Sequence, residues 1–228
     1  MKAEQHRGKD LHYLNIYPDD YDPALPYPLV IMLHGFGANM KDLATLAPMV
    51  ERQGYLYCCP NAPIPFDIGL GMAGYGWHPR REEATPEDFQ KAEDLLKEFF
   101  EEVFQQLGAT PGRIALLGFS QGGGMTYRCG LSEPETFAGL VALSASLPDP
   151  EQLRPKLPSQ RRQPIFIAHG RSDPLVPLDS AQATRKFLEE EGYQPAYHEY
   201  DMAHEIPPAV LKDLVPWLTE VLPPLHRD

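Results

Sequence analysis

Short apolar runs alternate with longer amphipathic stretches along most of this chain. The runs at 29–33 (Leu-Val-Ile-Met-Leu) and 114–117 (Ile-Ala-Leu-Leu) are continuously apolar. Such runs are typical of parallel strands that helices cover on both faces. The pattern predicts strands over 11–17, 29–34, 55–59, 113–119, 139–143, 165–169 and 196–200.

Amphipathic helices are predicted between these strands. In the clearest one, Thr85 provides a capping hydroxyl before Pro86, and acidic residues fill the first turn. Apolar residues then recur at helical spacing as far as Leu107, and Gly108 follows as a stop. The same reasoning predicts helices over 40–52, 85–107, 121–131, 179–191 and 207–221.

Strands that alternate with helices predict an α/β fold with a central, mostly parallel sheet and helices on both faces. The chain has 228 residues, which suits one large domain over 1–228. Internal repeats are not evident in the sequence. The proline-rich segment 148–164 is interpreted as a connector within the sheet topology.

The formal net charge is −12, from 32 acidic and 20 basic residues. This balance argues against a nucleic-acid binder and against electrostatic docking on anionic lipid. The polar first ten residues and the lack of an apolar run of about 20 residues predict no stable membrane insertion and a cytoplasmic protein. The three cysteines, Cys58, Cys59 and Cys129, are interpreted as core residues, without a disulfide framework or a zinc site.

The sharpest local motif is Gly118-Phe119-Ser120-Gln121-Gly122, between a predicted strand and a predicted helix. A tight turn there exposes a serine oxygen at a helix N-terminus, where developing negative charge is favoured. Glycines at 118 and 122 permit close backbone approach. Ser120 is therefore the candidate nucleophile, and a glycine-rich turn with an incidental serine is the alternative.

A serine nucleophile needs a histidine base and an acid that orients it, and α/β hydrolases carry them in the order Ser, acid, His. Asp173 follows the strand predicted at 165–169, and His204 follows the one at 196–200. These two residues complete the predicted triad, although Asp173 alone could simply begin a turn before Pro174. Alternative residues are His198 as the base and Asp201 or Glu205 as the acid.

Acyl transfer also needs two N–H donors for the oxyanion. The backbone N–H of Gln121, directly after the nucleophile, is one candidate. The second is expected in the loop after an early strand, where Phe36 is the first choice and Gly37 the second. A simple glycine turn is the alternative for this loop.

Residues 60–84 combine apolar side chains with several glycines and are predicted to form a lid or pocket loop over the acyl chain. The alternative is a long loop that packs on its own core. Trp77, and Leu175 beside the candidate acid, are the predicted substrate-binding residues. The apolar members of the loop are Ile64, Phe66, Ile68, Leu70, Met72, Tyr75 and Trp77.

These motifs, in this order, resemble the phospholipase/carboxylesterase family of α/β hydrolases, which includes bacterial carboxylesterases and acyl-protein thioesterases. The resemblance rests on five segments: 33–37, 60–63, 118–123, 169–173 and 202–206. It implies a cytosolic, metal-free and cofactor-free hydrolase with Ser120, Asp173 and His204 as triad. One departure is that Trp77 is followed by His78 and Pro79, where the family often has an aromatic residue and Asp.

The sequence therefore predicts a serine carboxylesterase that acts on small to medium acyl esters. A thioesterase or lysophospholipase with the same triad is the enzymatic alternative. The remote alternative is a catalytically silent binding protein on the same fold. The expected partner is a small ester or thioester substrate. The family resemblance is compatible with a homodimer, but the sequence carries no interface signal.

Overall fold

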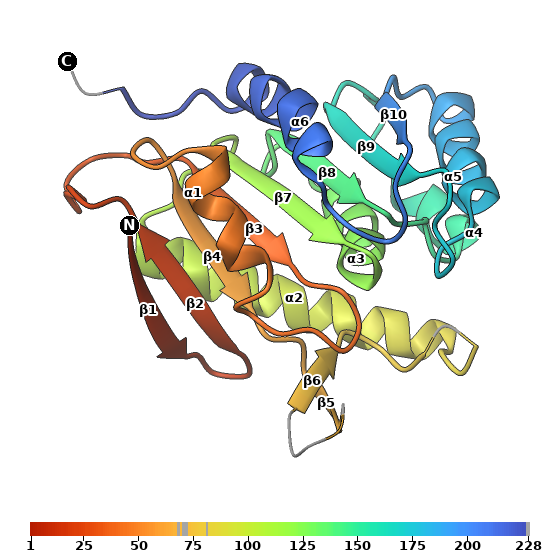
Figure 1. Cartoon of the computed structure of the whole chain (residues 1–228), viewed down its shortest axis with the longest axis horizontal. Helices are drawn as coiled ribbons and strands as arrows, with labels where there is room; N and C mark the ends of the chain where they lie inside the picture. The colour runs from red at the N-terminus through yellow and green to blue at the C-terminus, as the bar shows by residue number, and fades with distance from the viewer. Residues whose placement is uncertain (68, 70–72, 81, 227–228) are drawn as a thin grey trace.

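The computed structural model describes residues 1–67, 69, 73–80 and 82–226. Eight strands form one sheet in the order β1-β2-β4-β3-β7-β8-β9-β10 (Figure 1). β1 and β2 pair antiparallel, as do β2 and β4, and every pair from β4 onward is parallel. The strands are β1 Lys2–Arg7, β2 His12–Tyr17, β3 Leu29–Leu33, β4 Leu56–Pro60, β7 Ile114–Phe119, β8 Gly139–Leu143, β9 Ile165–Gly170 and β10 Ala196–Tyr200.

Helices cover both faces of this sheet and bury two apolar cores (Figure 1). One core contains side chains of α2, α3 and α5, and the other contains side chains of α1 and α6. The predicted α/β class and mostly parallel sheet are thereby confirmed. The helices are α1 Ala47–Val50, α2 Pro86–Leu107, α3 Gln121–Gly130, α4 Pro150–Leu153, α5 Leu178–Glu190 and α6 Pro208–Val221, with 3-10 turns η1 Leu43–Leu46 and η2 Arg154–Lys156.

Helix α2 begins and ends as its sequence predicts. The Thr85 side chain accepts a hydrogen bond from the Asp88 N–H, and the Asp88 carboxylate accepts one from the Thr85 N–H. Gly108 ends the helix in a left-handed conformation. A buried ion pair between Glu93 of α2 and Arg128 of α3 then joins this helix to the one that follows the candidate nucleophile.

Two elements differ from the prediction. β1 was not predicted because its side chains are mostly polar, and it lies at the outer edge of the sheet, where polar residues are tolerated. The helix predicted over 40–52 is reduced to η1 and the short α1. Before them, Asn39 and Asp42 bond nearby backbone N–H groups, an arrangement that competes with helix formation.

The segment 60–84 is more regular than the predicted loop. It contains an antiparallel hairpin of β5 (Ile64–Asp67) and β6 (Ala73–Gly76), which projects beyond the main sheet (Figure 1). Three of the apolar residues assigned to the lid, Ile68, Leu70 and Met72, lie outside the described residues.

Within the described ranges, no helix combines the length and the apolarity needed to cross a bilayer. The three cysteines are buried and unpaired with one another, as predicted. Burial raises the pKa of the Cys58 thiol well above its usual value. These thiols are therefore packing residues.

Candidate active site

Ser120 lies on a strained turn between β7 and α3. Its φ of 54° and ψ of −118° are unusual for a residue with a side chain. Two glycines make the turn possible: a Cβ at Gly118 would overlap the Gly122 carbonyl, and one at Gly122 would overlap the Leu33 carbonyl. The close approach required by the motif is therefore present, and the serine heads helix α3.

Asp173 lies in the loop after β9, with its carboxylate fully buried. The Asp173 Oδ1 atom accepts hydrogen bonds from the backbone N–H groups of Leu175 and Val176, each at 2.9 Å. These donors stabilise an ionised carboxylate and fix its orientation. The Asp173 Oδ2 atom is left for a histidine.

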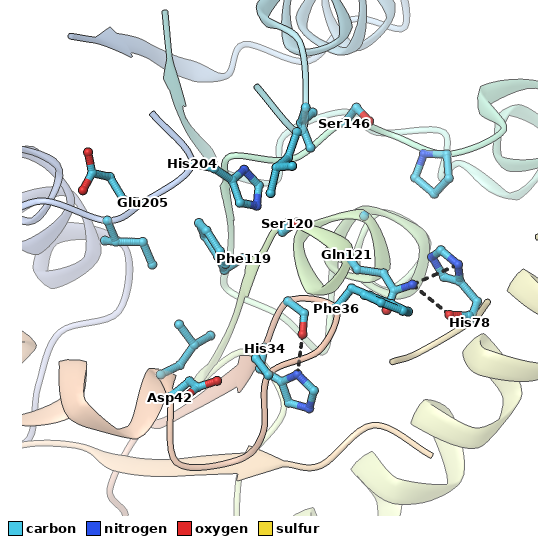
Figure 2. Close-up of a pocket in the computed structure, with 18 of the residues that line it drawn as sticks. His34, Phe36, Asp42, His78, Phe119, Ser120, Gln121, Ser146, His204 and Glu205 are labelled. Carbon is cyan, nitrogen blue, oxygen red and sulfur yellow. Dashed lines mark hydrogen bonds between the residues drawn. The ribbon is translucent and has the colours of Figure 1, made fainter. Parts of the chain in front are cut away.

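That histidine is His204, in the loop between β10 and α6. Its Nδ1 lies 2.7 Å from Asp173 Oδ2, so Nδ1–H donates to the carboxylate and Nε2 is left as an acceptor. The His204 ring packs on Phe119, with ring centroids 4.7 Å apart. Ser120 and His204 line the same cavity, and Figure 2 shows them beside each other.

The two predicted oxyanion donors also border this cavity. Gln121 is the first residue of α3, so its N–H has no acceptor within the helix. No hydrogen bond of the described residues uses the Phe36 N–H. The second choice, the Gly37 N–H, already donates to the Tyr75 carbonyl at 2.9 Å. Phe36 and Gln121 are therefore the better pair.

The cavity itself has a volume of about 740 Å³, within the usual range for small-molecule sites. Leu175 lies at its rim with 71% of its surface exposed, as expected of a residue that meets substrate. Four charged side chains also line it: Asp42, Arg80, Glu82 and Glu205. Among the described residues, its apolar lining consists of Phe36, Ala38, Leu43, Leu46, Phe89, Phe119, Pro148, Leu175, Val176 and Ile206.

Trp77 does not have the predicted position. It is only 1% exposed and is not among the described residues that line the cavity. Its indole Nε1–H donates to the His34 carbonyl at 2.9 Å, and its backbone N–H donates to Gln121 Oε1 at 2.7 Å. A buried indole N–H needs a hydrogen-bond acceptor, and here the acceptor is the His34 carbonyl. Trp77 therefore supports the loop that carries Phe36.

The side chain of Gln121 has a role that the sequence analysis missed. Its Nε2 donates to the His78 carbonyl at 2.9 Å (Figure 2). Its Oε1 also accepts the bond from the Trp77 N–H. The amide therefore ties the nucleophile helix to the segment after the hairpin. The sequence feature that could have indicated this role is an amide side chain directly after the candidate nucleophile.

The hairpin also contacts the loop 34–39, which carries Phe36 and is called the oxyanion loop below. The Tyr75 N–H donates to the Ala38 carbonyl at 2.8 Å, and the Phe36 and Phe66 rings lie 4.5 Å apart. A Cβ at Gly74 would overlap the Gly37 backbone. The hairpin is thus packed against the oxyanion loop as a fixed support.

The remaining candidates for base and acid make other contacts. His198 stacks on Phe166 within the sheet, and Asp201 pairs with Arg171 at 2.8 Å. Glu205 lines the cavity, whereas Asp173 holds His204. The alternatives for base and acid thus lack the contacts that Asp173 and His204 share.

His34 braces the oxyanion loop. Its Nδ1 donates to the Gly35 carbonyl at 2.7 Å, and its Nε2 accepts from the Ala62 N–H at 3.0 Å. Both nitrogens are used only if the imidazole is neutral. Burial lowers the pKa of His34 and favours the same neutral form, while the bond to Gly35 opposes that shift.

Comparison with known proteins places these features in a family. The phospholipase/carboxylesterase family model matches residues 23–222. Acyl-protein thioesterase 1 of Neurospora crassa is 32% identical, over 85% of this chain and 86% of its own. The protein of that name from Emericella nidulans is 29% identical, over 85% of this chain and 90% of its own.

Solved structures give the same picture. Esterase PE8 is 25% identical, with a TM-score of 0.79 and coverage of 97% of this chain and all of its own. The Bacillus cereus carboxylesterase, at 18% identity, supports the fold alone, with a TM-score of 0.75 over 93% of this chain and 95% of its own. This chain therefore belongs to the phospholipase/carboxylesterase family of hydrolases and has their α/β-hydrolase fold.

Proposed function

We propose that this protein is a serine carboxylesterase that hydrolyses small to medium acyl esters through Ser120, His204 and Asp173. The observation that carries the proposal is the 2.7 Å bond from His204 to the buried Asp173, beside a strained Ser120 on the same cavity. A serine hydroxyl becomes a nucleophile when an oriented, neutral imidazole accepts its proton.

In the first half-reaction, the His204 Nε2 takes the Ser120 proton while Oγ bonds to the substrate carbonyl carbon. The carbonyl oxygen becomes an oxyanion, and the N–H groups of Phe36 and Gln121 are its proposed donors. His204 then gives the proton to the leaving alkoxide, the carbon–oxygen bond breaks, and an acyl-serine remains.

Water completes the cycle. His204 accepts a proton from water as the hydroxide oxygen bonds to the acyl carbon, and the oxyanion forms again. When the intermediate collapses, the bond to Ser120 breaks, the serine regains a proton from His204 and the carboxylic acid leaves. Asp173 stays ionised and orients the imidazole in both halves.

A thioesterase using the same residues is the second candidate. The curated relatives named acyl-protein thioesterase 1 favour it, since they cover about 85% of this chain. A thiolate leaves more readily than an alkoxide, so the same site is competent for both bonds. The ratio of kcat/KM for matched esters and thioesters separates the two activities.

The test is hydrolysis of p-nitrophenyl esters of increasing acyl length and of matched acyl thioesters. We expect wild-type turnover and, in Ser120→Ala, a loss on the order of 10³-fold or more. The acyl length with the highest kcat/KM measures the usable part of the cavity. Equal turnover by the variant would refute the triad, and no turnover on any substrate would favour a silent binding protein.

A further inference from the structure

A second histidine lies behind the proposed catalytic acid. His169, within β9, is completely buried. Its Nε2 lies 2.8 Å from the Val176 carbonyl oxygen and 3.7 Å from Asp173 Oδ2. A carbonyl oxygen can only accept, so the hydrogen-bond pattern assigns the ring proton to Nε2.

Val176 is consequently held from both sides. Its N–H donates to Asp173 Oδ1 at 2.9 Å, and its carbonyl accepts from His169. The loop that turns the carboxylate toward His204 is thus held to strand β9 by the His169 side chain, besides the backbone bond from the Asp173 N–H to the Gly170 carbonyl. If that bond were lost, the Val176 carbonyl would be left without the partner that fixes this end of the loop.

The other ring nitrogen of His169, Nδ1, makes no hydrogen bond among the described residues. His169 Nδ1 and Ser144 Oγ are both buried, and neither has a hydrogen-bond partner among the described residues. The Ser144 N–H donates to the Ala168 carbonyl at 2.8 Å, so Ser144 follows β8 beside the residue that precedes His169 in β9. With its proton on Nε2, the His169 ring leaves Nδ1 as an acceptor.

Ser144 also connects this pair to the nucleophile. It follows β8 directly, with a φ of 47°, and the Ser120 N–H donates to the carbonyl of the preceding Leu143 at 2.9 Å. A strained residue at the carboxyl end of a strand, beside a site, is a common mark of a functional constraint. Strand β8, which ends just before Ser144, therefore lies between the strands that lead to Ser120 and Asp173.

We propose that His169 is a positioning residue for the catalytic acid: it holds the Val176 carbonyl and thereby aims Asp173 at His204. This inference rests on the proposed function of Asp173. His169 touches neither substrate nor the reacting atoms, so its effect on catalysis passes through Asp173.

The test is a double-mutant cycle on kcat, with His169→Phe and Asp173→Asn made singly and together. His169→Phe removes the donor, and a fall in kcat on the order of 10- to 100-fold with little change in KM is expected from a misplaced acid. In the Asp173→Asn background the same change should have almost no further effect, because the acid is already lost.

His169→Gln is the matched rescue variant, since its amide N–H can take the place of Nε2–H toward Val176. We expect it to recover most of the lost kcat. A merely structural histidine would instead lower kcat by the same factor in both backgrounds, in step with the melting temperature. That additive result would overturn the inference.

Imidazole ¹⁵N NMR provides a readout independent of turnover, because protonated and unprotonated ring nitrogens have distinct shifts. The His169 ring should carry its proton on Nε2 in the wild type and in Ser120→Ala. A proton on Nδ1 would contradict the proposal. If Ser120→Ala retained full activity, the proposed function itself would fail, which is distinguishable from an additive cycle.

Discussion

The loops at the carboxyl ends of the parallel strands and the segment 60–84 both line one cavity. The two regions are held in place by different contacts. At the sheet edge, Ser120, Asp173 and His204 each follow a parallel strand, and backbone hydrogen bonds hold their loops. The segment 60–84 is a separate hairpin, which backbone bonds at Tyr75 and the side chain of Gln121 join to the rest of the site. The first region carries the proposed triad, and the second contacts the loop that carries Phe36.

The strongest test of this division is Gln121→Ala. The backbone donor remains, but the amide bonds to Trp77 and His78 are lost. We expect kcat to fall by about 10²-fold, because the oxyanion loop and the helix shift relative to each other. Steady-state kinetics measures this, and Gln105→Ala, on the exposed face of α2, is the control. A change confined to KM would show that segment 60–84 is only a wall.

Trp77→Phe separates support from substrate contact. The change removes the Nε1–H donor and leaves the buried His34 carbonyl without that bond. We expect a loss of about 1–3 kcal/mol in the free energy of unfolding, measured in urea. The preference for acyl length should stay as in the wild type. If the acyl-length preference changed while the free energy of unfolding stayed the same, Trp77 would instead contact the acyl chain.

The buried His34 predicts acid sensitivity of the loop that it braces. The pKa of His34 is lowered from its usual 6.5 in the folded protein. Between these two pKa values, the unfolded chain binds a proton at this residue and the folded chain does not. Stability should therefore fall as the pH drops from about 6.5 toward the lower folded value. Urea titrations between pH 8 and 5 should show a smaller decline for His34→Asn than for the wild type. The exposed His12→Asn should keep the wild-type slope, and equal slopes would disprove the assignment.

The smallest effect is expected from Leu175→Ala, at the exposed rim. Stability should change by no more than about 0.5 kcal/mol. The KM for the longest accepted ester should rise by less than about tenfold, since only rim contacts are lost. Leu25→Ala, another exposed leucine that does not line the cavity, is the control. An identical response from both variants would show that Leu175 does not meet the acyl chain.

The two regions also differ in how well the sequence predicts them. Glycines at 118 and 122 mark the turn at Ser120 because no other residue fits there, and loops after buried strands locate Asp173 and His204. Apolar character in 60–84 is ambiguous, since a wall and a buried support have the same composition. Only the partner of the indole N–H distinguishes them for Trp77.

The same ambiguity explains the other differences. Hydrophobic spacing over 40–52 is compatible with a long helix, but Asn39 and Asp42 bond the local backbone instead. His169 carries no sequence signal beyond its place before Gly170, because its importance lies in a contact with Val176 seven residues later. Long-range hydrogen bonds of this kind are invisible to periodicity.

The polar edge strand β1 has a consequence for assembly. Its free side is the outer border of the sheet, and the strand carries the exposed charged residues Lys2 and Arg7. Charged side chains on an open strand discourage pairing with the strand of another molecule. We therefore expect that two copies of this chain do not join their sheets through β1. The polar residues that hide β1 from hydrophobic patterning are thus the same residues that disfavour edge-to-edge aggregation.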